Sequence, residues 1–149
     1  MVVVAQLRGG RLVHREVGRD ELDALLGQAG PGTDCPVTLI EIRLLGGALA
    51  RTPEGVADLV AGRDGRYVIG LVGLVVPPGG ERVPAAIESI LAALAGHVSE
   101  RTLVNFQGSV DGDGDSSRSW TEEGHARLLA AKNTYDPDNL LRFQHAVRA

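Results

Sequence analysis

Alternation of apolar and polar residues predicts several short β-strands. Val2 to Gln6 is rich in β-branched residues, and Arg11 to Glu16 resumes this pattern after a turn at two glycines. Pro36 to Arg43 also alternates, which places Glu41 and Arg43 on one side of the strand. Two later segments with apolar runs complete the set of expected strands: Arg66 to Val76 and Arg101 to Gln107.

Apolar residues at helical spacing predict three helices. The expected helices are one capped by Asp20 with Leu22, Leu25 and Leu26 on one face, one over Arg82 to His97, and one from a Ser119–Glu122 capping box to Asn133. Asp136-Pro137 forces the chain out of the last helix. Pro53 to Leu59 is expected to form a short helical turn, and Gly108 to Ser117 a polar loop.

These elements predict a single α+β domain over residues 1–149. We expect a mostly antiparallel sheet of about four to five strands, with helices packed on one face. The run Val68 to Val76 is apolar without alternation, which indicates a strand covered on both faces. Because strand edges that are left open tend to pair with another chain, we expect a homodimer or a complex with a second protein.

Composition excludes some classes of function. A net charge of −4 without a basic stripe and only 3% aromatic residues argue against nucleic-acid binding. Cys35 is the single cysteine, so no internal disulfide forms; we interpret it as a small filler residue in a reducing compartment. Tyr67 to Val76, the longest apolar run, is too short to span a bilayer. We therefore expect a cytoplasmic protein that does not bind membranes.

Two groups of residues have the side-chain types that bind metal ions: an acidic loop and the four histidines. Asp111, Asp113, Asp115 and Glu122 have the spacing of an EF-hand calcium loop, but Ser116 occupies the glycine position and a predicted strand precedes the loop. A solvated acidic loop is the favoured interpretation. The histidines share no metal-ligand spacing: His14, His97, His125 and His145. We predict no metal site.

Five blocks along the chain carry recognisable motifs: Ile40 to Ala48, Arg63 to Tyr67, Leu103 to Phe106, Arg127-Leu128 with Lys132, and the turn Tyr135 to Arg142. In this order they resemble the C-terminal region of the berberine-bridge-enzyme-like FAD-linked oxidases. Together they cover residues from about 20 to 145 in the family's order. Apart from the resemblance, Asp136, Pro137 and Asn139 are residue types that favour a turn. The positive charge of Lys132 complements the dipole at a helix C-terminus.

The resemblance implies roles for four residues. Asn105 and Phe106 would contact the flavin of FAD, and Arg43 and Leu103 would contact the substrate. For Asn105, a core amide with satisfied hydrogen bonds is an equal alternative. No catalytic residue is assigned. The family's tyrosine is replaced by Leu103, and Phe106 stands where some members carry a second tyrosine; neither side chain can act as a general base.

The family's flavin-binding domain, which carries the pyrophosphate-binding loop, has no counterpart among these blocks, so we expect weak or no FAD binding by the isolated chain. Our hypothesis is the C-terminal portion of an FAD-dependent oxidoreductase, covering flavin and a small-molecule substrate in a complete or split enzyme and inactive alone. Its partner would be a separate flavin-binding chain or a second copy. The alternative is a non-catalytic binding or assembly module derived from the same domain.

Overall fold

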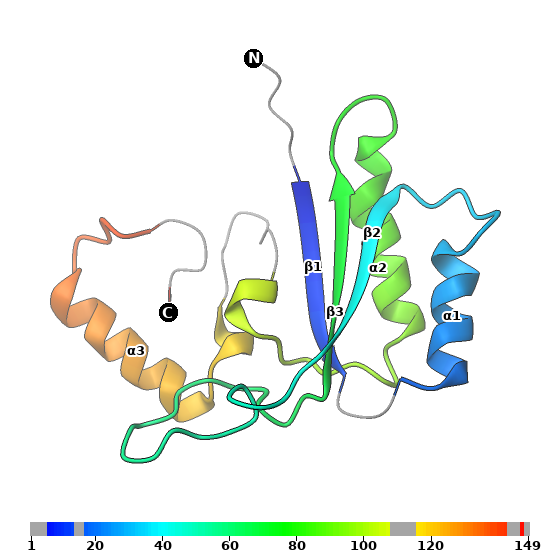
Figure 1. The fold of residues 1–149 in the computed structure, drawn as a ribbon. Helices are drawn as coiled ribbons and strands as arrows, with labels where there is room; N and C mark the ends of the chain where they lie inside the picture. Colours follow the sequence, from blue (N-terminus) through cyan, green and yellow to red (C-terminus); the bar gives the residue numbers. More distant parts are fainter. Residues whose placement is uncertain (1–5, 14–16, 108–115, 143–146, 148–149) are drawn as a thin grey trace.

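The computed structural model describes residues 6–13, 17–107, 116–142 and 147, and over these residues the chain is an α+β protein. Figure 1 shows a narrow sheet with α1 and α2 on one side and α3 on the other. The strands are β1 (Gln6–Val13), β2 (Val37–Leu44) and β3 (Tyr67–Leu74). The helices are α1 (Arg19–Ala29), α2 (Val83–Ala93) and α3 (Glu122–Tyr135), with 3-10 turns η1 (Gly80–Arg82), η2 (Val104–Phe106) and η3 (Ser117–Ser119).

The sheet is antiparallel as predicted, but its described part has three strands in the order β1-β3-β2, not four to five. One reason is that β1 runs through Gly9 and Gly10, which pair with Leu71 and Gly70 where a turn was expected. Two glycines can adopt extended backbone as readily as a turn, and pairing with β3 decides between them. The other reason is that Arg101 to Gln107 contains η2 instead of a strand.

The hydrophobic core lies between β3 and the two helices on one face of the sheet. Ile69 and Leu71 point toward the helices and pack in one buried cluster with Ile87 and Ile90 of α2 and Leu25 of α1. The strand predicted over Arg66 to Val76 is confirmed as β3, which lies between β1 and β2 in the described sheet. None of the helices in the described part of the chain is long and apolar enough to cross a membrane.

Two helices begin at different residues than the sequence suggested. The N-cap of α1 is Gly18, whose N–H donates to Glu21 Oε2 at 2.9 Å, and not Asp20. The N-cap of α3 is Thr121, whose Oγ1 accepts from Gly124 N at 2.9 Å. Ser119, the expected cap, is buried and donates to Gln107 Oε1 at 2.9 Å. Asp20 and Ser119 each lie two residues from the observed cap and have side chains that commonly cap helices. Cap propensity alone therefore does not determine the residue at which a helix begins.

The predicted apolar face of α1 is only partly buried. Leu25 lies in the core, whereas Leu22 and Leu26 are exposed. The predicted helical turn over Pro53 to Leu59 is wrong, since that segment consists of turns and irregular backbone. It is held by Asp58, which receives two hydrogen bonds from the Arg63 guanidinium, while Arg63 also donates to Leu49 O at 3.0 Å.

A network around Asp136 ends α3 as the sequence predicted. The Asp136 carboxylate accepts hydrogen bonds from the backbone N–H groups of Leu140 and Leu141, at 2.7 and 2.9 Å, and from Lys132 Nζ. Lys132 also donates to Leu141 O at 2.7 Å. Asn139 has a left-handed backbone with φ of 51°, which confirms it as a turn residue. The motif therefore holds the backbone of residues 140 and 141 against the end of α3.

Acid should destabilise the protein through Asp58 and Asp136. Hydrogen bonds from Arg63 and from Lys132, respectively, lower the pKa of these carboxyls in the folded state. Because the folded pKa lies below the unfolded value of about 4, their contribution is present above that value and is lost as pH falls through the folded pKa. We expect urea midpoints to stay level from pH 7 to 5 and to drop below about pH 4. Asp136→Asn should flatten this drop, whereas substitution of the exposed Asp138 by asparagine should not; an equal drop in both variants would contradict the assignment.

Candidate functional site

The face of the sheet that α1 and α2 leave uncovered carries Arg43, one of the predicted site residues. Ile40 of β2 packs into the core, so its neighbours Leu39 and Glu41, and then Arg43, point to the opposite side. A Cβ built on Gly70 of β3 would lie 3.7 Å from Glu41 Oε2, so Gly70 shares this side. We call the surface formed by Leu39, Glu41, Arg43, Gly70 and Val72 the open face.

Arg43 contacts both a charged and an aromatic side chain at the open face. Its Nη2 donates to Glu41 Oε1 at 2.5 Å, and its guanidinium carbon lies 5.3 Å from the centre of the Phe106 ring. That distance fits a cation–π contact. The structure thus brings Arg43, predicted as a substrate contact, against Phe106, predicted as a flavin contact, although the two lie far apart in sequence.

The segment that carries Phe106 differs from the prediction in its backbone. Leu103 has extended backbone and caps η2, and it is half-buried; Asn105 lies within η2 and is exposed. The mid-strand position expected for Asn105 is therefore wrong, and so is the alternative of a buried core amide. An exposed amide keeps its donors and acceptor available to a bound molecule. Figure 1 shows η2 on the side of the sheet away from α1 and α2, next to β1.

The open face offers binding groups with a particular chemistry. Phe106 and the Arg43 guanidinium provide flat surfaces for stacking, and Glu41 provides a hydrogen-bonding group beside them. Asn105, next to Phe106 in η2, is an exposed hydrogen-bonding group. Such a surface suits the edge or face of a planar polar ring. At Leu103 and Phe106 it offers no hydroxyl that could transfer a proton.

The N-termini of α1 and α3 do not suit a pyrophosphate. A diphosphate needs free N–H groups at a helix N-terminus and the absence of negative charge there. In α1 the first turn holds Asp20 and Glu21, and the Glu21 carboxylate already occupies Gly18 N. In α3 the first turn holds Glu122 and Glu123. The first turns of α1 and α3 therefore repel a diphosphate.

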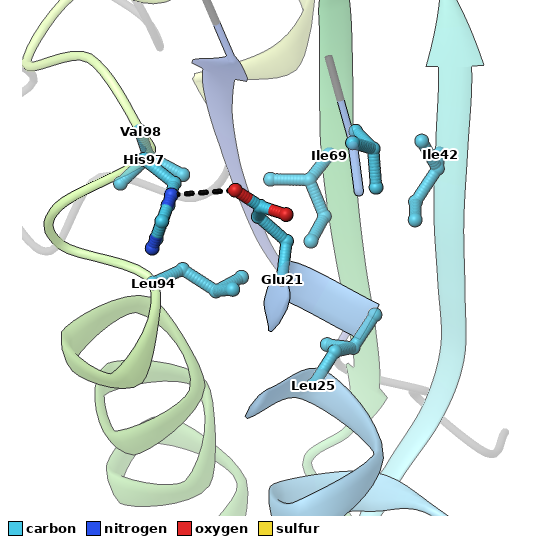
Figure 2. A pocket seen from close by; sticks show the side chains of 8 residues that line it. Glu21, Leu25, Ile42, Ile69, Leu94, His97 and Val98 are labelled. Atoms are coloured by element: carbon cyan, nitrogen blue, oxygen red, sulfur yellow. Dashed lines mark ion pairs between the residues drawn. The ribbon is translucent and has the colours of Figure 1, made fainter. Parts of the chain in front are cut away.

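A small pocket lies on the other face, between the helices and the sheet. Glu21 Oε1 and His97 Nδ1 form an ion pair at 2.7 Å across its mouth, and Leu25, Ile42, Ile69 and Leu94 form its walls (Figure 2). Its volume of about 20 Å³ has room for about one water molecule. It is too small for a flavin or an organic substrate.

A shallow polar groove of about 380 Å³ borders the start of α3. It mixes opposite charges, including Arg101, Arg118, Glu100 and Glu122, so it has no strong preference for an ion of either sign. His125 Nε2 is buried there without a hydrogen-bond partner among the described residues. Across the described ranges, no three His, Cys, Asp or Glu side chains are grouped as metal ligands. The acidic residues Asp111, Asp113 and Asp115 lie outside the described residues.

Sequence reasoning did not anticipate two charged pairs, one on the open face and one in the loop before β3. Glu41 was placed beside Arg43 by strand alternation, but its role as the partner that orients Arg43 needed the structure. The Asp58–Arg63 pair was also missed, although Arg63 belongs to a family-like block. A short charged pair at a spacing of two along a strand is the signal that could have identified Glu41.

Comparison with known families supports the resemblance over the end of the chain. Residues 116–148 match the family model described as berberine and berberine like. The matched part contains α3 and the Lys132–Asp136 network, so the family-like C-terminal segment predicted from the sequence is confirmed there. A search of curated protein sequences finds no match to the chain.

Proposed function

We propose that this chain is the substrate-side portion of an FAD-linked oxidoreductase, and that its open face covers the flavin ring and a small-molecule substrate. The carrying observation is the Arg43–Phe106 contact, which joins two family-like blocks on the surface that α1 and α2 leave free. The family match over residues 116–148 supports the same assignment independently.

In this proposal each residue has a limited task. Asn105 hydrogen-bonds the edge of the flavin ring, and Phe106 packs beside it while holding Arg43 in place. Arg43, oriented by Glu41, binds an anionic or carbonyl oxygen of the substrate. When FAD is bound, it supplies the hydride-accepting chemistry. The phosphates of FAD would be held by a flavin-binding domain, in a complete or a split enzyme.

A flavin titration tests the proposal. The isolated chain should purify colourless and bind riboflavin and FAD with similar affinity, worse than micromolar, because its residues address the ring and not the diphosphate. Amide chemical shifts in NMR should move at residues 41–43 and 103–106. Asn105→Ala should weaken these changes, and substitution of the exposed Asn133 on α3 by alanine serves as the matched control.

Other outcomes of that titration are equally clear. A yellow preparation with stoichiometric flavin after gel filtration would contradict the expected weak binding. Flavin-induced shifts confined to another surface would overturn the placement on the open face. The absence of any shift at high flavin concentration would favour the second candidate, a non-catalytic binding or assembly module, for which the loss of ionisable hydroxyls at Leu103 and Phe106 is the supporting feature.

A further inference from the structure

We propose that β2 pairs with β2 of a second copy of this chain, forming a two-fold symmetric dimer with one continuous sheet. Among the residues that the structure describes, β2 pairs only with β3 and forms one end of the sheet. The inference concerns assembly and does not rest on flavin chemistry.

The backbone of β2 determines which residues can pair across the free edge. Leu45 N donates to Arg66 O at 2.8 Å, so the backbone groups of Leu45, and of every second residue before it, point toward β3. The backbone N–H and C=O groups of Ile40, Ile42 and Leu44 consequently point outward. These three residues can form the hydrogen-bonded pairs of a new antiparallel ladder.

Charge then selects one register for that ladder. If Ile42 lies opposite Ile42 of the second copy, Glu41 lies opposite Arg43 of the second copy, and the symmetry repeats this pair. Such positions are non-hydrogen-bonded pairs, in which opposing side chains are closest. Moving the two-fold axis by one residue would instead place Glu41 or Arg43 opposite itself, which like-charge repulsion disfavours.

This charge pattern differs from that of a protected edge. Edge strands that avoid pairing often carry charges that repel a second copy. Here charges of opposite sign lie two residues apart on the same side of β2, so the edge is complementary to itself. The partner copy would also reach the open face, since its Glu41 would lie beside Arg43, which the intrachain Glu41 already contacts.

Exposed apolar side chains flank the same edge. Ile42 and Leu44 of β2 are 38% and 66% exposed, and Leu22 and Leu26 of α1 are 41% and 54% exposed. Helix α1 borders β2, because Leu25 and Ile42 line the same pocket. Glu21 of α1 contacts His97, and Gln28 of α1 contacts Ser89 of α2, so this face of α1 points toward α2. Leu22 and Leu26 lie on a different face of α1, which does not point toward α2. Pairing of β2 would cover this apolar surface.

Light scattering during size exclusion tests the dimer. At micromolar concentration the native chain should have twice its mass of 15.6 kDa. Glu41→Arg and Arg43→Glu should each raise the dissociation constant about tenfold or more, because each turns two attractions into repulsions. A mixture of the two single variants should form a dimer again, and so should the double variant. These exposed positions should leave the circular dichroism melt of the monomer cooperative.

A disulfide trap tests the register. In a Cys35→Ser background, Ile42→Cys should cross-link two copies under mild oxidation, since its Cα atoms would be about 5.5 Å apart across the axis. Leu44→Cys is the control, because its two Cα atoms would be about 14 Å apart. A monomer at all concentrations, no rescue by mixing, or equal cross-linking at both positions would overturn the proposal.

Discussion

Replacing Gly73 with alanine is expected to lower the free energy of unfolding by about 1–3 kcal/mol, the usual cost of overpacking a core. Gly73 is buried in β3 on the helix-covered face, and a Cβ at this position would overlap Val83 Cγ1 and lie 3.0 Å from its Cγ2. Val83 is itself buried and β-branched, so it cannot rotate away without moving α2.

Gly70→Ala is the matched control for Gly73. It lies in the same strand, but its Cβ would meet only Glu41 atoms, at 3.7 and 3.9 Å, which is ordinary contact. Urea unfolding monitored by circular dichroism should show a lower midpoint for Gly73→Ala and an unchanged or higher midpoint for Gly70→Ala. Equal midpoints for the two variants would show that the spacing between α2 and β3 is wider than described.

Replacing Gly124 with alanine should loosen the attachment of α3. A Cβ at Gly124 would lie 2.7 Å from both Leu59 O and Thr121 Oγ1, and Leu59 O also accepts the Thr121 N–H at 2.9 Å. The backbone of residue 59 must therefore move or α3 must shift. We expect a net loss of about 1–2 kcal/mol, because the overpacking cost exceeds the gain in helix propensity of about 1 kcal/mol.

Gly27→Ala provides the comparison for Gly124. Gly27 lies within α1 with no atom within 4 Å of its Cβ position, so alanine there should raise the free energy of unfolding by about 0.5–1 kcal/mol. Hydrogen exchange gives the local readout: amides of α3 should exchange faster in Gly124→Ala while those of β3 keep their protection. Unchanged exchange in α3 would contradict the close approach at Leu59.

Local sequence patterns correctly predicted those helices and strands in which all local preferences favour the same secondary structure. The apolar run of β3, the alternation of β2 and the helical spacing of α2 are each confirmed within a few residues. Asp136-Pro137 ends α3 as predicted, because proline and an acceptor side chain act on neighbouring backbone. The family-like C-terminal segment followed from the same kind of local information.

Segments with competing local preferences were decided by tertiary contacts. Gly9 and Gly10 would suit a turn, yet pairing with β3 keeps them extended. Val104 to Phe106 has strand-like residues but forms η2, where Phe106 meets Arg43. Thr121 caps α3, where its N–H also bonds Leu59 O, while Ser119 is buried against Gln107. In each case contacts between distant segments outweigh propensities of about 1 kcal/mol or less.

The candidate site shows the same division. Strand alternation determined from the sequence that Glu41 and Arg43 share a face, and the resemblance selected Asn105, Phe106, Arg43 and Leu103. Only the tertiary structure placed the Arg43 guanidinium against the Phe106 ring and exposed Asn105. It also showed that β2 ends the sheet formed by the described residues, where its charges are self-complementary. Side-chain period along one strand is a local property of the backbone, whereas contact between residues 43 and 106 depends on the path of the whole chain between them.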